Sequence, residues 1–163
     1  MKENKISIQI HKPLHEVFLF CITPPNSIKW IPDIIREETN EWPVKIGTVY
    51  SLSNNKSETS RVTVSQILKN KVVEWVSEDG NYHCRYTYKS FGPNVTELQY
   101  NEWVDGGEID EPFDEKVLRK LKKVLENHMI KGLILDVDGV LVGGKKGYNW
   151  PDPHPDVIAT FKR

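Results

Sequence analysis

The sequence has few of the features that mark specialised protein classes. Only two of its 163 residues are cysteine, Cys21 and Cys84, and their spacing matches no C-x-x-C motif. We therefore expect two reduced thiols in a cytoplasmic protein rather than a disulfide framework. No apolar run approaches the roughly 20 residues that a membrane span requires. The charged N-terminus also lacks the apolar stretch of a secretory signal.

The charge balance excludes another class of partner. Twenty-two Lys and Arg residues are interspersed with 23 Asp and Glu residues, which leaves a formal net charge of −1. Without a basic face, nucleic acid is not expected as the main partner. The hydrophobic and charged fractions, 38% and 28%, are typical of a globular protein with a real core.

The N-terminal third alternates between strand and helix signals. Residues 5–10 alternate apolar and polar side chains, which predicts a half-buried strand. Pro13 suits the first turn of a helix, and apolar residues then recur at helical spacing to Cys21. A short helical turn over residues 27–31 carries Trp30.

The middle of the chain reads as closely spaced strands without intervening helices, a pattern typical of an antiparallel meander. In the strand predicted over residues 61–68, alternation places Val62, Val64 and Leu68 on one face. In the strand predicted over residues 82–89, four alternate residues from Tyr82 to Tyr88 share one face, and His83 and Arg85 lie on the other, solvated face. The predicted strands are 33–38, 47–52, 61–68, 71–77, 82–89 and 95–104.

The clearest helix is predicted over residues 112–127, where an apolar stripe runs among Lys, Glu and Arg. A sheet with one apolar face can bury it by curling around such a helix. We therefore predict an α+β fold for residues 1–127, in which a curved antiparallel sheet wraps a long C-terminal helix.

Particular segments resemble the START-like superfamily, also called SRPBCC or polyketide cyclase/dehydrase-like. They are Lys-Pro-Leu-His-Glu-Val-Phe at 12–18, Trp-Ile-Pro at 30–32, Pro-Val-Lys-Ile-Gly-Thr at 43–48, and parts of the two last strands. The resemblance covers residues 3–127 and implies a helix-grip fold with an elongated cavity for lipids, polyketides or hormones. It does not imply a reaction, since none of these motifs is catalytic.

Aromatic side chains predicted to point inward are the candidate ligand-binding residues. Rings that carry one polar atom suit an apolar pocket that needs a few oriented hydrogen bonds. The alternative is that the same rings simply fill the core. The candidates are Trp30, Tyr50, Trp75, Tyr82, Tyr86, Tyr88 and Tyr100.

Glu102 is a candidate of a different kind, because alternation places its carboxyl group on the inward face with Leu98, Tyr100 and Val104. An inward carboxyl group could act as a general acid or base, or anchor a ligand. Alternatively, it lies at the end of the strand in water beside a lysine.

The composition changes at residue 128. An apolar strand over residues 130–137 leads into Asp-x-Asp-Gly-x-Leu, which resembles the first motif of haloacid-dehalogenase-like phosphohydrolases. Asp136 and Asp138 lie two apart and so project together at the end of a strand. The resemblance implies that Asp136 is the nucleophile and a Mg²⁺ ligand, with Asp138 the general acid or base.

The later motifs of that family are missing, because they would lie beyond Arg163. One strand and one helix cannot complete a metal site, so Asp136 and Asp138 should hold Mg²⁺ weakly, and no phosphatase activity is expected from this chain. Residues 128–163 could be the truncated start of a fused phosphohydrolase, or a cloning or gene-boundary artefact. Their unpaired strand could also mediate self-association.

Four functions are consistent with these observations. The leading one is intracellular binding of a small hydrophobic or amphipathic molecule, with no cofactor required by residues 1–127. The second is a cyclase or dehydratase that uses Glu102 and tyrosine hydroxyl groups. The third is the severed front of a START-like phosphohydrolase fusion, and the fourth is a co-chaperone-like interaction that no particular residue supports.

Overall fold

Within residues 1–127 seven antiparallel strands form one sheet, and the burial of most of them follows the apolar alternation of the sequence. A computed structural model describes residues 1–127, which form one compact unit. Asp136, Asp138 and the predicted strand at 130–137 lie outside the described residues. The strands stand in the order β1-β7-β6-β5-β4-β3-β2. They are β1 (Glu3–Ile10), β2 (Ile34–Thr39), β3 (Val49–Asn54), β4 (Thr59–Leu68), β5 (Val72–Ser77), β6 (Tyr82–Ser90) and β7 (Thr96–Val104).

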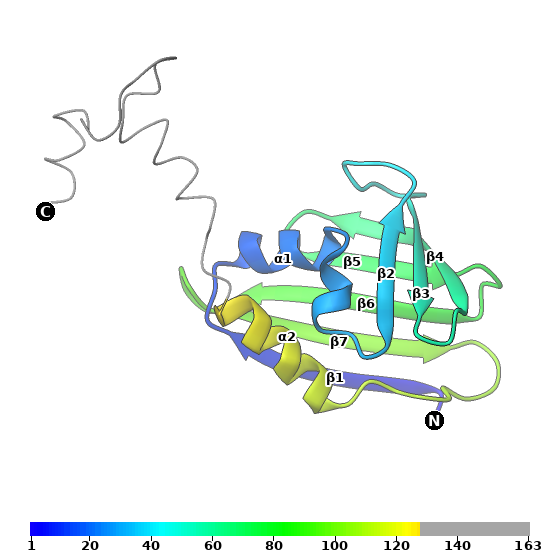
Figure 1. Cartoon of the computed structure of the whole chain (residues 1–163). Coiled ribbons are helices and arrows are strands. Elements are labelled where there is room, and N and C mark those ends of the chain that lie inside the picture. Colours follow the sequence, from blue (N-terminus) through cyan, green and yellow to red (C-terminus); the bar gives the residue numbers. More distant parts are fainter. Residues whose placement is uncertain (128–163) are drawn as a thin grey trace, which may run out of the picture. The chain divides into compact units, whose positions relative to one another are not determined.

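All neighbouring strands pair antiparallel, as the short connections require. The chain adds β2 to β7 one after another, and β1 then pairs with β7 at the far edge of the sheet. The sheet curls strongly, so that β2 crosses in front of the central strands (Figure 1). This curvature creates the concave face on which the helices lie.

Residues 1–127 also contain three helical segments, and each begins directly after a proline or a capping residue. They are α1 (Leu14–Ile22), the 3₁₀ turn η1 (Asn26–Lys29) and α2 (Glu115–Asn127). Helix α2 begins three residues later than predicted because Asp114 caps it: the Asp114 carboxylate accepts the backbone N–H groups of Lys116 and Val117 at 2.9 and 3.1 Å. None of the described helices is long and apolar enough to cross a membrane.

Helix α2 packs its apolar stripe against the sheet beside β1 (Figure 1). Leu118, Leu121 and Leu125 are buried there in the same core as Val17 and Phe18 of α1. At the end of α2, the carboxylate of Glu126 accepts the backbone N–H of His11 at 2.8 Å, which links the helix to the segment after β1. The prediction of a curved sheet around a C-terminal helix is confirmed.

A β-bulge in β4 corrects one predicted face. The pairing with β5 shifts between Val64 and Gln66, so one extra residue interrupts the alternation. As a result Ile67, not Leu68, packs against the core, and Leu68 is 53% exposed. Simple alternation from Val62 and Val64 cannot anticipate this, because an inserted residue reverses every face beyond it.

Truncation of the α2 stripe should test how strongly this helix holds the domain together. Leu121 is fully buried, so we expect Leu121→Ala to lower the free energy of unfolding by about 2–5 kcal/mol. The matched change Leu19→Ala, at a helical leucine that is 52% exposed, should shift it by less than about 0.5 kcal/mol. Urea unfolding of the full chain followed by tryptophan fluorescence measures both. Equal effects would contradict the packing of α2 described here.

Candidate functional site

A cavity of about 210 Å³ lies on the concave side of the sheet. One wall is a continuous series of aromatic rings, whose neighbouring centroids are 4.9–5.8 Å apart. Residues from α1, η1 and the segment after it, β2, β3, β4 and β6 complete the lining. The rings of the series, in spatial order, are Tyr50, Trp75, Tyr86, Tyr100 and Phe113.

Five of the seven aromatic candidates line this cavity: Tyr50, Trp75, Tyr82, Tyr86 and Tyr100. The other two are buried but lie outside the lining. Trp30 packs behind it, with its ring centroid 6.3 Å from that of Tyr86, and Tyr88 packs edge-on against Phe18 of α1. Five of the predicted aromatic residues thus line the cavity, and the other two pack behind or beside those that do.

Glu102 is 1% exposed, so the alternative of a solvated strand end is wrong. One carboxylate oxygen accepts the side-chain amide of Asn4 and the backbone N–H of Phe113, both at 2.8 Å. The other accepts the hydroxyl groups of Tyr82 and Tyr100 at 2.7 and 2.8 Å. Four donors therefore surround this carboxylate, which lies outside the cavity lining. A catalytic role for Glu102 stays a prediction, and the geometry described here is that of a structural hub.

A second buried carboxyl group, Glu37 of β2, faces the cavity itself and is 6% exposed. Its two oxygens accept the backbone N–H of Ser27 at 2.9 Å and the Ser27 hydroxyl at 2.6 Å. Burial raises the pKa of Glu37 above its ordinary value of 4.5, although the two Ser27 hydrogen bonds oppose this shift. In the described part of the chain Glu37 is thus a buried carboxyl group with Ser27 as its one hydrogen-bond partner.

The sequence offered no signal for Glu37. It lies in the weakest predicted strand, among the charged residues Arg36 and Glu38, where a solvated face is the natural reading. A register shift between Ile34 and Arg36 brings Glu37 to the cavity. The aliphatic lining residues and Phe113 were likewise not among the candidates, because they belong to loops or to the apolar faces of strands.

The remaining polar groups of the lining are held in their neutral forms. Burial, with a smaller contribution from the charge of Glu37, raises the pKa of Tyr50, whose hydroxyl group donates to the carbonyl of Ile22 at 2.6 Å. Burial also raises the pKa of Cys21 to about 12 and that of Cys84 above its ordinary value. The lining therefore presents hydroxyl and thiol groups rather than anions, with Glu37 as the exception.

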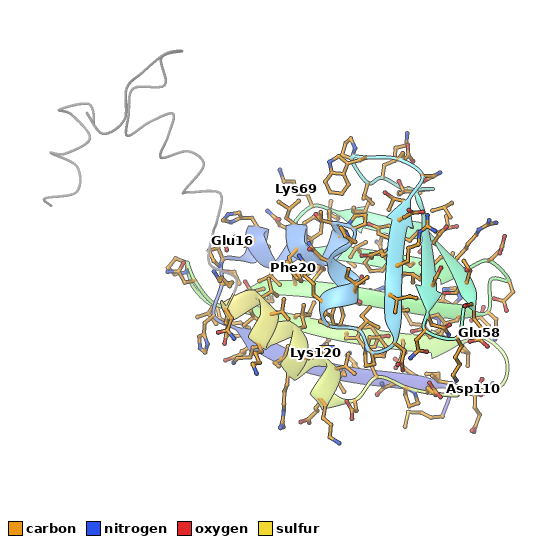
Figure 2. The ribbon with its side chains drawn as sticks, in the orientation of Figure 1. Glu16, Phe20, Glu58, Lys69, Asp110 and Lys120 are labelled. Carbon is orange, nitrogen blue, oxygen red and sulfur yellow. The ribbon has the colours of Figure 1, made fainter. Side chains whose placement is uncertain are left out.

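An open groove of about 870 Å³ adjoins the cavity. Ile31, Ile34 and Phe113 line both spaces and so form their common boundary. The groove lies between the β3–β4 hairpin and the segment that leads into α2. Figure 2 labels three of its bordering residues: Glu58 of the hairpin, Asp110 before α2, and Lys120 on α2.

Two other surface features lie away from this cavity. A hollow of about 530 Å³ lies between α1, the 42–45 segment and the β4–β5 turn, and its lining includes the exposed side chains of Leu19 and Trp42. On the opposite face of the sheet, His83 stacks on Trp103 with ring centroids 4.8 Å apart. The His83 side chain is only 18% exposed, so the expectation that it is solvated is wrong. Neither feature contains a buried carboxyl group.

Within residues 1–127 no group of three or more potential metal ligands is clustered. The predicted Mg²⁺ ligands Asp136 and Asp138 lie beyond the described part of the chain. No protein-family model matches the sequence, and no curated protein is significantly similar to it.

Solved structures do match the fold. A START superfamily protein from Mycobacterium smegmatis superposes with a TM-score of 0.58 at 13% identity, over 82% of this chain and 99% of that one. Protein NE0264 from Nitrosomonas europaea superposes with a TM-score of 0.61 at 9% identity, over 78% of this chain and 96% of that one. Protein MLL2253 from Mesorhizobium loti superposes with a TM-score of 0.59 at 12% identity, over 79% of this chain and 100% of that one. At such identities the likeness shows the fold alone, and the predicted helix-grip architecture is confirmed.

Replacement of the buried carboxyl group should stabilise the protein in a pH-dependent way. The folded state raises the pKa of Glu37. The stability gained from its protonated form is therefore complete below about pH 4.5 and is lost as the pH rises through the folded-state pKa. Glu37→Gln retains a donor and an acceptor for Ser27 and does not titrate. We expect its melting temperature to exceed that of the wild type by roughly 2–5 °C at pH 8 and to match it near pH 4.

The matched control is Glu38→Gln, one residue away, where the carboxylate is 59% exposed and pairs with Arg36. It should leave the melting temperature almost unchanged at both pH values. Thermal unfolding followed by circular dichroism measures all three proteins. A Glu37→Gln variant that is less stable than the wild type at pH 8 would show that the carboxylate is favourably solvated.

Proposed function

We propose that residues 1–127 bind one small amphipathic molecule in the cavity of the concave face. The observation that carries this proposal is the composition of the lining. A continuous series of aromatic rings and the carboxyl group of Glu37 belong to the same, otherwise mainly apolar, cavity. Apolar walls with a few oriented polar groups are typical of small-molecule sites.

The energetic cost of the cavity supports the same function. A dry void of about 210 Å³ would cost about 5 kcal/mol at the coefficient measured for engineered cavities. That is comparable to the total stability of many domains. The indole N–H of Trp75 is also buried and has no hydrogen-bond partner among the described residues. A bound molecule with an acceptor atom would offset both costs.

The groove beside the cavity is the proposed route of entry. Its boundary with the cavity consists of Ile31, Ile34 and Phe113, which are all half-buried side chains on short connecting segments or at the end of a strand. Rotation of such side chains needs no rearrangement of the sheet. A ligand could therefore enter between the β3–β4 hairpin and the segment before α2.

Binding is favoured over the predicted catalysis by Glu102 and tyrosine hydroxyl groups because these groups are already engaged. The Glu102 carboxylate is occupied by four donors, and the two tyrosine hydroxyl groups among them donate to it. Burial raises the pKa of both Tyr82 and Tyr100, so neither hydroxyl group is a base near neutral pH. The fold shared with the START superfamily structure agrees with a binding role and leaves the ligand open.

A change that fills the cavity should abolish binding without unfolding the protein. Leu52 lines the cavity, so Leu52→Trp should reduce the fluorescence increase of the neutral apolar probe Nile red by about tenfold or more at equal protein concentration. Native mass spectrometry of the freshly purified full chain should in addition detect a co-purified small molecule in the wild type that is absent from Leu52→Trp.

The control is the same substitution at Leu68, which is exposed and borders no part of the cavity. Leu68→Trp should bind Nile red as the wild type does. Circular dichroism would verify that both variants are folded. If the wild type carries no bound species and does not respond to Nile red, the proposed function is wrong.

A further inference from the structure

Among the described residues, the cavity contains one acidic group and no basic group. Its lining there includes Glu37 but no lysine, arginine or histidine. The nearest basic residue in sequence, Arg36, points to the other face of β2 and pairs with Glu38 at 2.8 Å. Within residues 1–127 Glu37 has no ion pair, and its hydrogen bonds come from Ser27 alone. A buried carboxyl group either keeps a proton or pairs with a cation, and residues 1–127 supply no such cation to Glu37.

We propose that the molecule held in the cavity is a hydrophobic amine, whose ammonium group pairs with the carboxylate of Glu37. This inference rests on the proposed function and specifies the chemical class of its ligand.

The geometry of Glu37 leaves room for such a pair. Each carboxylate oxygen accepts one hydrogen bond from Ser27, the first from the backbone N–H and the second from the hydroxyl group. A carboxylate oxygen has two acceptor positions, so each retains one. The contrast with Glu102 is direct, because four protein donors occupy that carboxylate. Of the two, Glu37 is the one that lines the cavity and keeps acceptor positions that no donor within residues 1–127 occupies.

The aromatic wall favours the same ligand class. Faces of tryptophan and tyrosine attract a cation through the negative potential above the ring. Tyr50 and Trp75 both line the cavity with Glu37, and their rings pack edge to face with centroids 5.8 Å apart. An ammonium group in this cavity would thus have a carboxyl group and aromatic rings among its neighbours.

The groove that leads to the cavity carries a complementary charge. Its lining contains five carboxylates and three lysines, which gives an excess of two negative charges. Figure 2 shows two of the carboxylates, Glu58 and Asp110, at the same end of the domain. Such an excess raises the local concentration of cations and repels anions at low ionic strength. The charged residues are Asp33, Glu58, Asp110, Glu111, Asp114, Lys56, Lys116 and Lys120.

Other headgroups fit less well. A fatty acid would place a second carboxylate beside Glu37 in a site of low polarity, where like charges repel strongly. A neutral alcohol could donate one hydrogen bond to Glu37 but would leave the charge uncompensated. The three headgroups can therefore be ranked as amine, alcohol and carboxylate, in decreasing affinity.

Three probes that share one alkyl chain test this ranking: n-octylamine, 1-octanol and octanoate. Isothermal titration calorimetry of the full chain at pH 7.5 should give a Kd for n-octylamine at least about tenfold lower than that for 1-octanol, with octanoate weakest. Glu37→Gln should raise the Kd for n-octylamine to about that of 1-octanol and leave the 1-octanol value unchanged. Glu38→Gln, the matched control, should preserve the preference for the amine.

The pH dependence supplies a second measurement. Protonation of Glu37 removes the anionic partner, and its pKa is raised above the ordinary 4.5. The affinity for n-octylamine should therefore fall as the pH is lowered from 7.5 to 4.5, and that for 1-octanol should not. If the wild type binds 1-octanol and n-octylamine equally, or if Glu37→Gln retains the preference for the amine, the amine assignment is overturned and the proposed binding function stands. If no probe binds and no species co-purifies, both are overturned.

Discussion

The arrangement of the domain depends on the carboxylate of Glu102. Through Asn4, Tyr82 and Tyr100 it joins β1, β6 and β7, and through the backbone N–H of Phe113 it fixes the segment that enters α2. Phe113 then stacks on Tyr100 with ring centroids 4.9 Å apart, so the same hub positions the last ring of the cavity wall. A buried carboxylate is costly unless it is fully hydrogen-bonded, and here that requirement holds Phe113 in place just before the Asp114 cap of α2.

Two buried carboxyl groups have opposite relations to the cavity. Glu102 lies outside its lining and is saturated by donors from four parts of the chain, whereas Glu37 lines it and, within residues 1–127, is hydrogen-bonded to Ser27 alone. A buried polar group whose hydrogen-bonding positions are all occupied by protein donors serves to stabilise the fold. A group with unoccupied positions can still bind another molecule. The aromatic residues divide in the same way, since Trp30 and Tyr88 support a wall that other rings form.

Much of the fold was predictable because strand alternation and helix periodicity are local properties of the chain. The inward face of β6 and the stripe of α2 follow directly from spacing, and five of the seven aromatic candidates do line the cavity. The bulges in β2 and β4 were not predictable, because an inserted residue leaves no local signal and reverses the faces beyond it. For this shared reason Leu68 was assigned to the wrong face, and Glu37, the most informative residue of the site, was not recognised as a candidate.

The two thiols of the lining have a chemical consequence for any occupant. Only thiolates attack electrophiles at appreciable rates. With the pKa of Cys21 raised to about 12, on the order of one molecule in 10⁵ would carry that thiolate at pH 7, and Cys84 is shifted in the same direction. Neither thiol would therefore be alkylated at an appreciable rate by an enone or epoxide in the cavity. The same burial that makes the cavity apolar thus makes its two thiols chemically unreactive.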